Sequence, residues 1–195
     1  MKKLLSIATA LTLSLAVFAG GEEKYSVDNS ISKMEWVGKK VTGQHNGTVT
    51  VKSGDVMVED GMITGGTLMI DMNSIVVLDI KDEETNAKLL GHLKSDDFFS
   101  VEKNPMAKLV ITKVEEKGDK YHIHGDLTIK GITEKVEIPA KIKMEDGKVV
   151  AIGETEIDRT KFDIRYGSGK FFEGLGDKMI YDNFIVKFKV GAKKS

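Results

Sequence analysis

Residues 120–144 read KYHIHGDLTIKGITEKVEIPAKIKM, and this stretch decides the fold class. Apolar and polar residues alternate along both halves of it, on either side of a turn signal at Gly131. A period of two is typical of a β-strand that buries one face and exposes the other. The residues that this period assigns to the buried faces are Tyr121, Ile123, Leu127 and Ile129, then Val136, Ile138, Ala140, Ile142 and Met144.

The same period recurs on both sides of this stretch. Turn signals such as Asp60-Gly61 and Asp146-Gly147 separate runs of roughly ten residues. Strands of that length joined by short turns predict an antiparallel all-β domain, built as a meander, a sandwich or a barrel. Near the C-terminus, the segment DNFIVKFKV places on one face Phe184, Val186, Phe188 and Val190.

One segment departs from the period of two. In DEETNAKLLGHLKSDDFF, residues 82–99, the apolar residues recur at helical spacing and acids stand at the start. We therefore expect a short α-helix over residues 83–94, with Asp82 as its N-cap. No repeat or linker interrupts the chain, which indicates a single domain.

The N-terminus has the pattern of a secretory signal peptide. Lys2 and Lys3 precede an apolar run, and Val17 and Ala19 supply the small-x-small pattern that a signal peptidase recognises. A transmembrane helix fits less well, because the run is short and is followed by glycines and acids. The sequence predicts a signal peptide over residues 1–19, export to the periplasm or the medium, and no stable membrane span after cleavage.

Composition excludes several classes of function. The chain has 195 residues, a formal net charge of −1 and no cysteine. Disulfides and thiolate metal sites are therefore excluded, and no basic cluster indicates nucleic-acid binding. His122 and His124 lie two apart on one strand, but on its polar face, so no metal site is expected. No cofactor is expected either.

Enzyme motifs are also missing from the sequence. There is no Gly-x-Ser-x-Gly elbow, His-Glu-x-x-His helix or phosphate loop. The acid pairs Asp96-Asp97 and Glu115-Glu116 would diverge on a strand, which is poor geometry for acid–base catalysis. We expect a protein that is not an enzyme.

Five motifs resemble the YceI-like family of exported bacterial proteins. The resemblance covers residues 25–190, and the motifs occur in the family's order. One position departs from the family pattern: Asp163 stands where glycine usually follows the phenylalanine. The matching stretches are GQHNGTVTV (43–51, after Trp36), GGTLMIDMNSI (65–75), GHLKSDDFFSVEKNPMAKLVIT (91–112), IHGDLTIKGITEKVEIP (123–139) and IDRTKFDIRYG (157–167).

The resemblance implies an antiparallel, lipocalin-like barrel of eight strands, with the helical segment near one end. It also implies a ligand such as a polyisoprenoid or a fatty-acid-like lipid inside the barrel. Alternation alone leaves open whether the interior is hollow, because eight strands enclose just enough room to be filled or to hold one small ligand. The expected lining residues are Met34, Trp36, Met69, Ile123, Leu127, Ile138, Phe184 and Phe188.

Polar residues are needed only where a head group would sit. Arg159 and Arg165 are the only arginines in a lysine-rich chain. A guanidinium can donate two parallel hydrogen bonds to one phosphate or carboxylate group. The candidates for contact with a head group are Arg159, Lys161, Arg165 and His92. A structural ion pair is the alternative for Arg159. The loop that carries Phe171 and Phe172 is expected to cover the entrance or to dock on the apolar wall, and contact with a membrane is a lesser option.

The sequence thus predicts an exported binding protein that sequesters a polyisoprenoid or similar long-chain amphiphile. The alternative is a filled β-barrel that serves as a structural or protein-interaction module without a lipid. The sequence leaves open which lipid is bound and whether the protein forms a homodimer.

Overall fold

Nine β-strands and one α-helix make up residues 21–195, the part of the chain that the computed structural model describes. The predicted signal peptide, residues 1–19, lies outside the described residues. The elements are β1 (Glu23–Val27), β2 (Lys33–Lys40), β3 (Gly43–Glu59), β4 (Met62–Val77), α1 (Glu83–Lys94), β5 (Met106–Lys117), β6 (Lys120–Ile129), β7 (Ile132–Glu145), β8 (Lys148–Asp158) and β9 (Asn183–Lys194), with short 3₁₀ turns η1 (Asn29–Ile31), η2 (Arg159–Phe162) and η3 (Gly176–Lys178).

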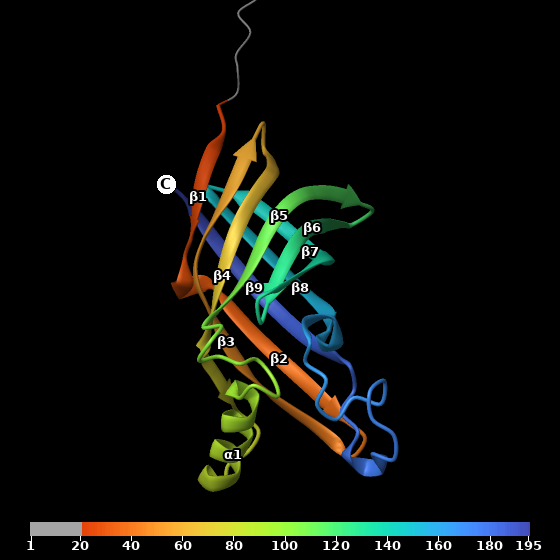
Figure 1. Ribbon diagram of the computed structural model, residues 1–195. Helices are drawn as coiled ribbons and strands as arrows, with labels where there is room; N and C mark the ends of the chain where they lie inside the picture. The colour runs from red at the N-terminus through yellow and green to blue at the C-terminus, as the bar shows by residue number, and fades with distance from the viewer. Residues whose placement is uncertain (1–20) are drawn as a thin grey trace, which may run out of the picture.

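The strands form one antiparallel sheet that closes on itself (Figure 1). Neighbours in the sequence pair in turn from β3 to β9, and both β1 and β2 pair with β3 on one side and β9 on the other. β1 and β2 therefore occupy one strand position between them. The predicted eight-stranded antiparallel barrel is confirmed.

The interruption between β1 and β2 has a local cause. The carboxylate of Asp28 accepts a hydrogen bond from the backbone N–H of Ser30 at 2.9 Å and caps η1. The side chain of Ile31 then packs directly over Gly191 of β9, where an added Cβ would lie only 2.3 Å from it. The chain turns out of the strand and re-enters the same sheet position without breaking the barrel wall.

Three of the hairpins have two-residue turns with positive φ at both positions. They are Asp60-Gly61, Lys130-Gly131 and Asp146-Gly147, with φ of 50° to 52° at the first residue and 68° to 77° at the second. Such turns are common in hairpins because they match the right-handed twist of the strands they join. Aspartate and glycine are frequent in them because both residues tolerate a positive φ. The turn signals in the sequence marked the strand ends correctly here.

The predicted helix is confirmed at residues 83–94. Asp82 caps it by accepting a hydrogen bond from the N–H of Thr85 at 2.9 Å. Asn86 ties the helix to the end of β4 by donating to the carbonyl of Val77 at 3.0 Å. In Figure 1, α1 and the loop between β8 and β9 project from the same end of the barrel, opposite to the end where β1 begins and β9 finishes. Within residues 21–195, no helix has the length and apolar character needed to cross a bilayer.

Candidate functional site

The barrel encloses a cavity of about 230 Å³ with an almost entirely apolar lining. The inner face of every strand from β2 to β9 contributes to this lining. This volume lies just below the ~300–1,000 Å³ typical of small-molecule pockets.

The cavity is long and narrow. Phe184 and Ala192 both line it and lie eight residues apart on β9, which is about 26 Å at ~3.3 Å per residue. The modest volume is therefore spread along much of the barrel. A flexible hydrocarbon chain fits such a tube better than a compact ring system does.

Several large side chains on the inner face retain accessible surface. Trp36, Phe184 and Phe188 point inward yet are only half-buried. In a filled barrel such residues would be fully buried, because close packing leaves few voids larger than a water molecule. The interior is hollow, so the packed interior of the alternative prediction is wrong.

A separate apolar cluster closes the far end of the tube. It consists of Tyr25, Val56, Val58, Val149 and Ala192, each less than a tenth exposed. Three of these residues, Val56, Val149 and Ala192, also line the cavity. These buried side chains therefore close this end of the tube.

The other end opens to solvent between the end of β2 and the start of β9. Lys39, Tyr181 and Asn183 line the cavity and are exposed. The same three residues border a polar surface cleft together with Glu156, Lys170 and Asp182. We call this opening, defined by Lys39, Tyr181 and Asn183, the mouth. It is the only part of the described lining where charged and amide groups gather at the surface.

Arg159 holds the loop beside the mouth rather than facing solvent. It is 4% exposed, and it donates hydrogen bonds to four backbone carbonyls at 2.8 to 3.1 Å. Burial lowers the pKa of the guanidinium, while Asp182 and Asp158 raise it. Its donors are occupied by the protein, so the structural alternative for Arg159 is the one that the geometry supports. The four acceptors are Ile164, Tyr166, Ile180 and Tyr181.

The other two basic candidates do not reach the cavity. Arg165 is exposed, pairs with Asp163 through Nε at 2.8 Å, and stacks over the ring of Phe171 at 4.9 Å. Lys161 is exposed as well. Neither residue lines the cavity. The expectation that Arg165 and Lys161 contact a head group near the opening stays a prediction.

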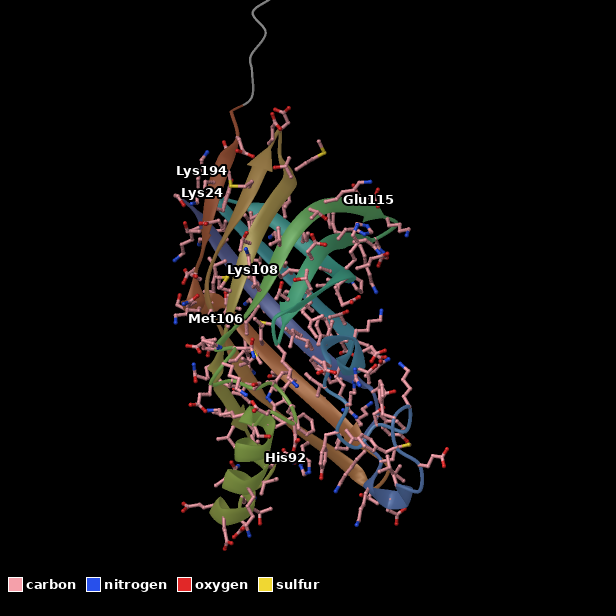
Figure 2. All side chains as sticks on the ribbon, in the orientation of Figure 1. Lys24, His92, Met106, Lys108, Glu115 and Lys194 are labelled. Atoms are coloured by element: carbon pink, nitrogen blue, oxygen red, sulfur yellow. The ribbon has the colours of Figure 1, made fainter. Side chains whose placement is uncertain are left out.

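His92 joins the helix to the loop instead of lining the tube. Its ring packs edge-on against Phe98 at 4.9 Å and Tyr166 at 4.5 Å. In Figure 2, His92 projects from α1 toward the loop between β8 and β9. Leu93, Phe98 and Phe99, which accompany it, do line the cavity. His92 thus packs on the outer side of a residue that lines the cavity, and does not line the cavity itself.

Of the predicted lining residues, all but Met69 face the cavity. Met69 pairs with Lys108 of β5 and lies on the outer wall, while its neighbours Leu68 and Ile70 line the interior. The expectation for Met69 is wrong because a strand alternates its faces, and Asp71 two residues later already marks the outer face. The residues placed as predicted are Met34, Trp36, Ile123, Leu127, Ile138, Phe184 and Phe188.

The family model for a YceI-like domain matches residues 25–192, nearly all of the described chain. This chain belongs to the YceI-like family. Among curated relatives, a UPF0312 protein of Photorhabdus laumondii is 42% identical over 74 residues, which cover 37% of this chain and 38% of that protein. A UPF0312 protein of Pseudomonas aeruginosa is 41% identical over 68 residues, or 34% and 36% of the two chains. These matches span little more than a third of either relative.

Solved structures resemble this YceI-like chain over most of its length. Burkholderia cenocepacia BcnA is 25% identical, with a TM-score of 0.68 over 86% of this chain and 99% of its own. A polyisoprenoid-binding domain from Saccharophagus degradans is 14% identical, with a TM-score of 0.63 over 88% and 98%. At that identity the second likeness shows the shared fold alone.

The one departure from the family pattern has a backbone explanation in this YceI-like protein. Asp163 adopts the left-handed conformation, with φ of 57°, at the end of η2. Glycine reaches that conformation without strain, and aspartate is among the few other residues that tolerate it. The substitution therefore preserves the turn that carries the chain from Phe162 to Ile164.

Sequence reasoning missed the three residues of the mouth. Tyr181 reaches Lys39 through a hydrogen bond from its backbone N–H to the Lys39 carbonyl at 3.0 Å. Lys39 lies one residue before the end of β2 and Asn183 begins β9, and neither belongs to a motif. Their adjacency follows from β2 pairing with β9, which no local signal reveals.

Proposed function

We propose that this YceI-like protein binds the apolar chain of a polyisoprenoid or similar long-chain amphiphile inside the barrel, with the polar head at the mouth. One observation carries the proposal: a narrow apolar tube, lined along about 26 Å of β9, that is closed at one end and opens at a polar cleft at the other. The polyisoprenoid-binding domain of Saccharophagus degradans, which shares the fold, supports this choice of ligand class.

The energetics suit sequestration. Each buried methylene contributes about 0.8 kcal/mol, so a chain of several isoprene units gains a large gross driving force, less the cost of ordering it. The walls of the tube are almost entirely apolar, which disfavours a charged group in the interior but not at the mouth. Binding rather than chemistry is the role that this lining serves.

Export is part of the proposal. A signal peptide over residues 1–19 would place the barrel in the periplasm or the medium, where a free isoprenoid chain is nearly insoluble. Mass determination of the mature N-terminus tests this. A mature chain that still carries residues 1–19 in the cytoplasm would contradict it.

Native mass spectrometry of freshly purified protein tests the binding itself. We expect one chain-like ligand per barrel, or uptake of one added prenol such as geranylgeraniol, and a lipid extract identifies the co-purified molecule. A protein that carries nothing and ignores added prenols, fatty alcohols and fatty acids would refute the proposal.

A further inference from the structure

Five large apolar side chains are exposed around the opening of the tube. They come from the end of β2 and from the loop between β8 and β9, which Figure 1 shows side by side at one end of the barrel. Each is 44% to 50% exposed. We call this set the aromatic rim: Val41, Tyr166, Phe171, Phe172 and Tyr181.

The loop presents these side chains in a fixed arrangement. The backbone N–H groups of Phe171 and Phe172 both donate to the carbonyl of Ser168 at 3.1 Å, and Ser168 is fully buried. Arg159 fixes the two ends of the loop through its bonds to the carbonyls of Ile164 and Ile180. Phe171 and Phe172 do not line the cavity, and both side chains are exposed. They are held outward.

The charges beside the rim favour an anionic partner. Within residues 21–195, four exposed lysines beside the rim and the mouth have no carboxylate at ion-pair distance, against three exposed acids there that have no cation at ion-pair distance. The remaining acids of the loop are paired with Arg159, Arg165 or Lys170. The four lysines are Lys39, Lys40, Lys161 and Lys178, and the three acids are Glu156, Glu173 and Asp177.

We propose that the aromatic rim is a docking surface for an anionic lipid bilayer, so that a chain passes between membrane and tube without crossing water. The inference rests on the proposed function. Aromatic side chains with apolar bodies favour the membrane–water interface, and lysines near an anionic surface add attraction. A membrane is favoured over a protein partner because the rim borders the mouth of an apolar tube, with Tyr181 belonging to both.

Vesicle co-sedimentation of the purified protein tests the proposal. The probes are vesicles of phosphatidylglycerol mixed with phosphatidylcholine, and vesicles of phosphatidylcholine alone. The first variant is Phe171→Ser with Phe172→Ser, and the second is Lys161→Glu with Lys178→Glu. The matched control is Met62→Ser with Ile152→Ser, which removes two exposed apolar side chains away from the mouth, 67% and 51% exposed. All variants are compared with the same N-terminus as the original protein, so differences between them report on the rim.

We expect the protein to bind the anionic vesicles, and more weakly as salt rises. The Phe171/Phe172 variant should bind them at least about tenfold less tightly, because two aromatic side chains are lost from the interface. The Lys161/Lys178 variant should lose the preference for anionic over neutral vesicles. The control should bind like the original protein. Uptake of geranylgeraniol from a cyclodextrin complex should be unchanged in all four, which separates docking from chain binding.

Other outcomes overturn the inference. Vesicle binding that is absent, or equal in the Phe171/Phe172 variant and the control, removes the membrane as the partner even if geranylgeraniol still binds. Loss of geranylgeraniol uptake in a folded Phe171/Phe172 variant assigns the two rings to the cavity instead. A change in sedimentation coefficient without a change in vesicle binding assigns the rim to contact between copies of this chain.

Discussion

Arg159 donates a hydrogen bond through Nη2 to the carbonyl of Ile180, 3.0 Å away and 21 residues further along the chain. The same guanidinium bonds the carbonyl of Ile164 at 2.8 Å, so one buried side chain joins the beginning of the loop to its end. The position of the mouth depends on this link, because Ile180 and Tyr181 both line the opening.

Arg159→Ala should lower the free energy of unfolding by about 3 kcal/mol or more, because it leaves several buried carbonyls without a donor. Arg159→Lys should recover little, since an ammonium cannot reach carbonyls on both arms of the loop. Urea denaturation measures both. Arg165→Ala is the matched control and should change stability by less than about 0.5 kcal/mol, because its pair with Asp163 is exposed. Equal losses for the two alanine variants would contradict the structural role of Arg159.

Val186→Trp should block chain uptake, because Val186 lines the tube near the start of β9 and is only half-buried. The indole should fill the hollow at a tolerable cost of about 1–3 kcal/mol in stability. Native mass spectrometry with geranylgeraniol should show affinity at least about tenfold weaker. Met69→Trp is the control, since Met69 lies on the outer wall beside Lys108, and it should bind normally. Normal binding by a folded Val186→Trp would place the ligand outside the tube.

Lys39→Met should weaken a fatty acid relative to the matching fatty alcohol by about threefold, because a solvated ion pair contributes under about 1 kcal/mol. Lys39 lines both the cavity and the polar cleft, whereas Arg165 lines neither. Arg165→Ala should therefore leave the ratio of the two affinities unchanged. Calorimetric titration with both ligands gives that ratio. If the two variants shift it equally, the effect comes from net charge and not from a contact at the mouth.

Asp28 should contribute stability that is lost in acid. A hydrogen bond and ion pair with Lys193, then hydrogen bonds from the side chain and backbone of Ser30, lower the pKa of Asp28 from 3.8 to about 2. The unfolded chain therefore takes up this proton first as the pH falls. The stabilisation is complete above about pH 4 and disappears towards pH 2.

Asp28→Asn tests this pH dependence because it keeps the cap but removes the charge. Thermal unfolding should show the variant less stable than the original protein at neutral pH, with the gap closing between about pH 4 and pH 2. A gap that stays constant over this range would show that the charge of Asp28 contributes nothing to folding.

The barrel itself could be read from the sequence because its determinants are local. The alternation in residues 120–144 and the aspartate–glycine turns specify strands and hairpins within a few residues of each other. The helix at residues 83–94 was equally readable, since Asp82 and the spacing of the leucines act within one segment. The misplacement of Met69 came from its residue type; the period of two, with Asp71 on the same face, pointed outward.

The sequence by itself determined that strands with one apolar face must pair in order, because burying that face requires only nearest neighbours along the chain. Only the tertiary structure decided that the enclosed space stays open, because that depends on how the side chains of eight strand positions meet across the barrel. It also decided that Arg159 turns inward to backbone carbonyls and that Lys39 meets Tyr181 and Asn183 at the mouth. Those contacts join residues far apart in the chain, and their energies exist only once the sheet has closed.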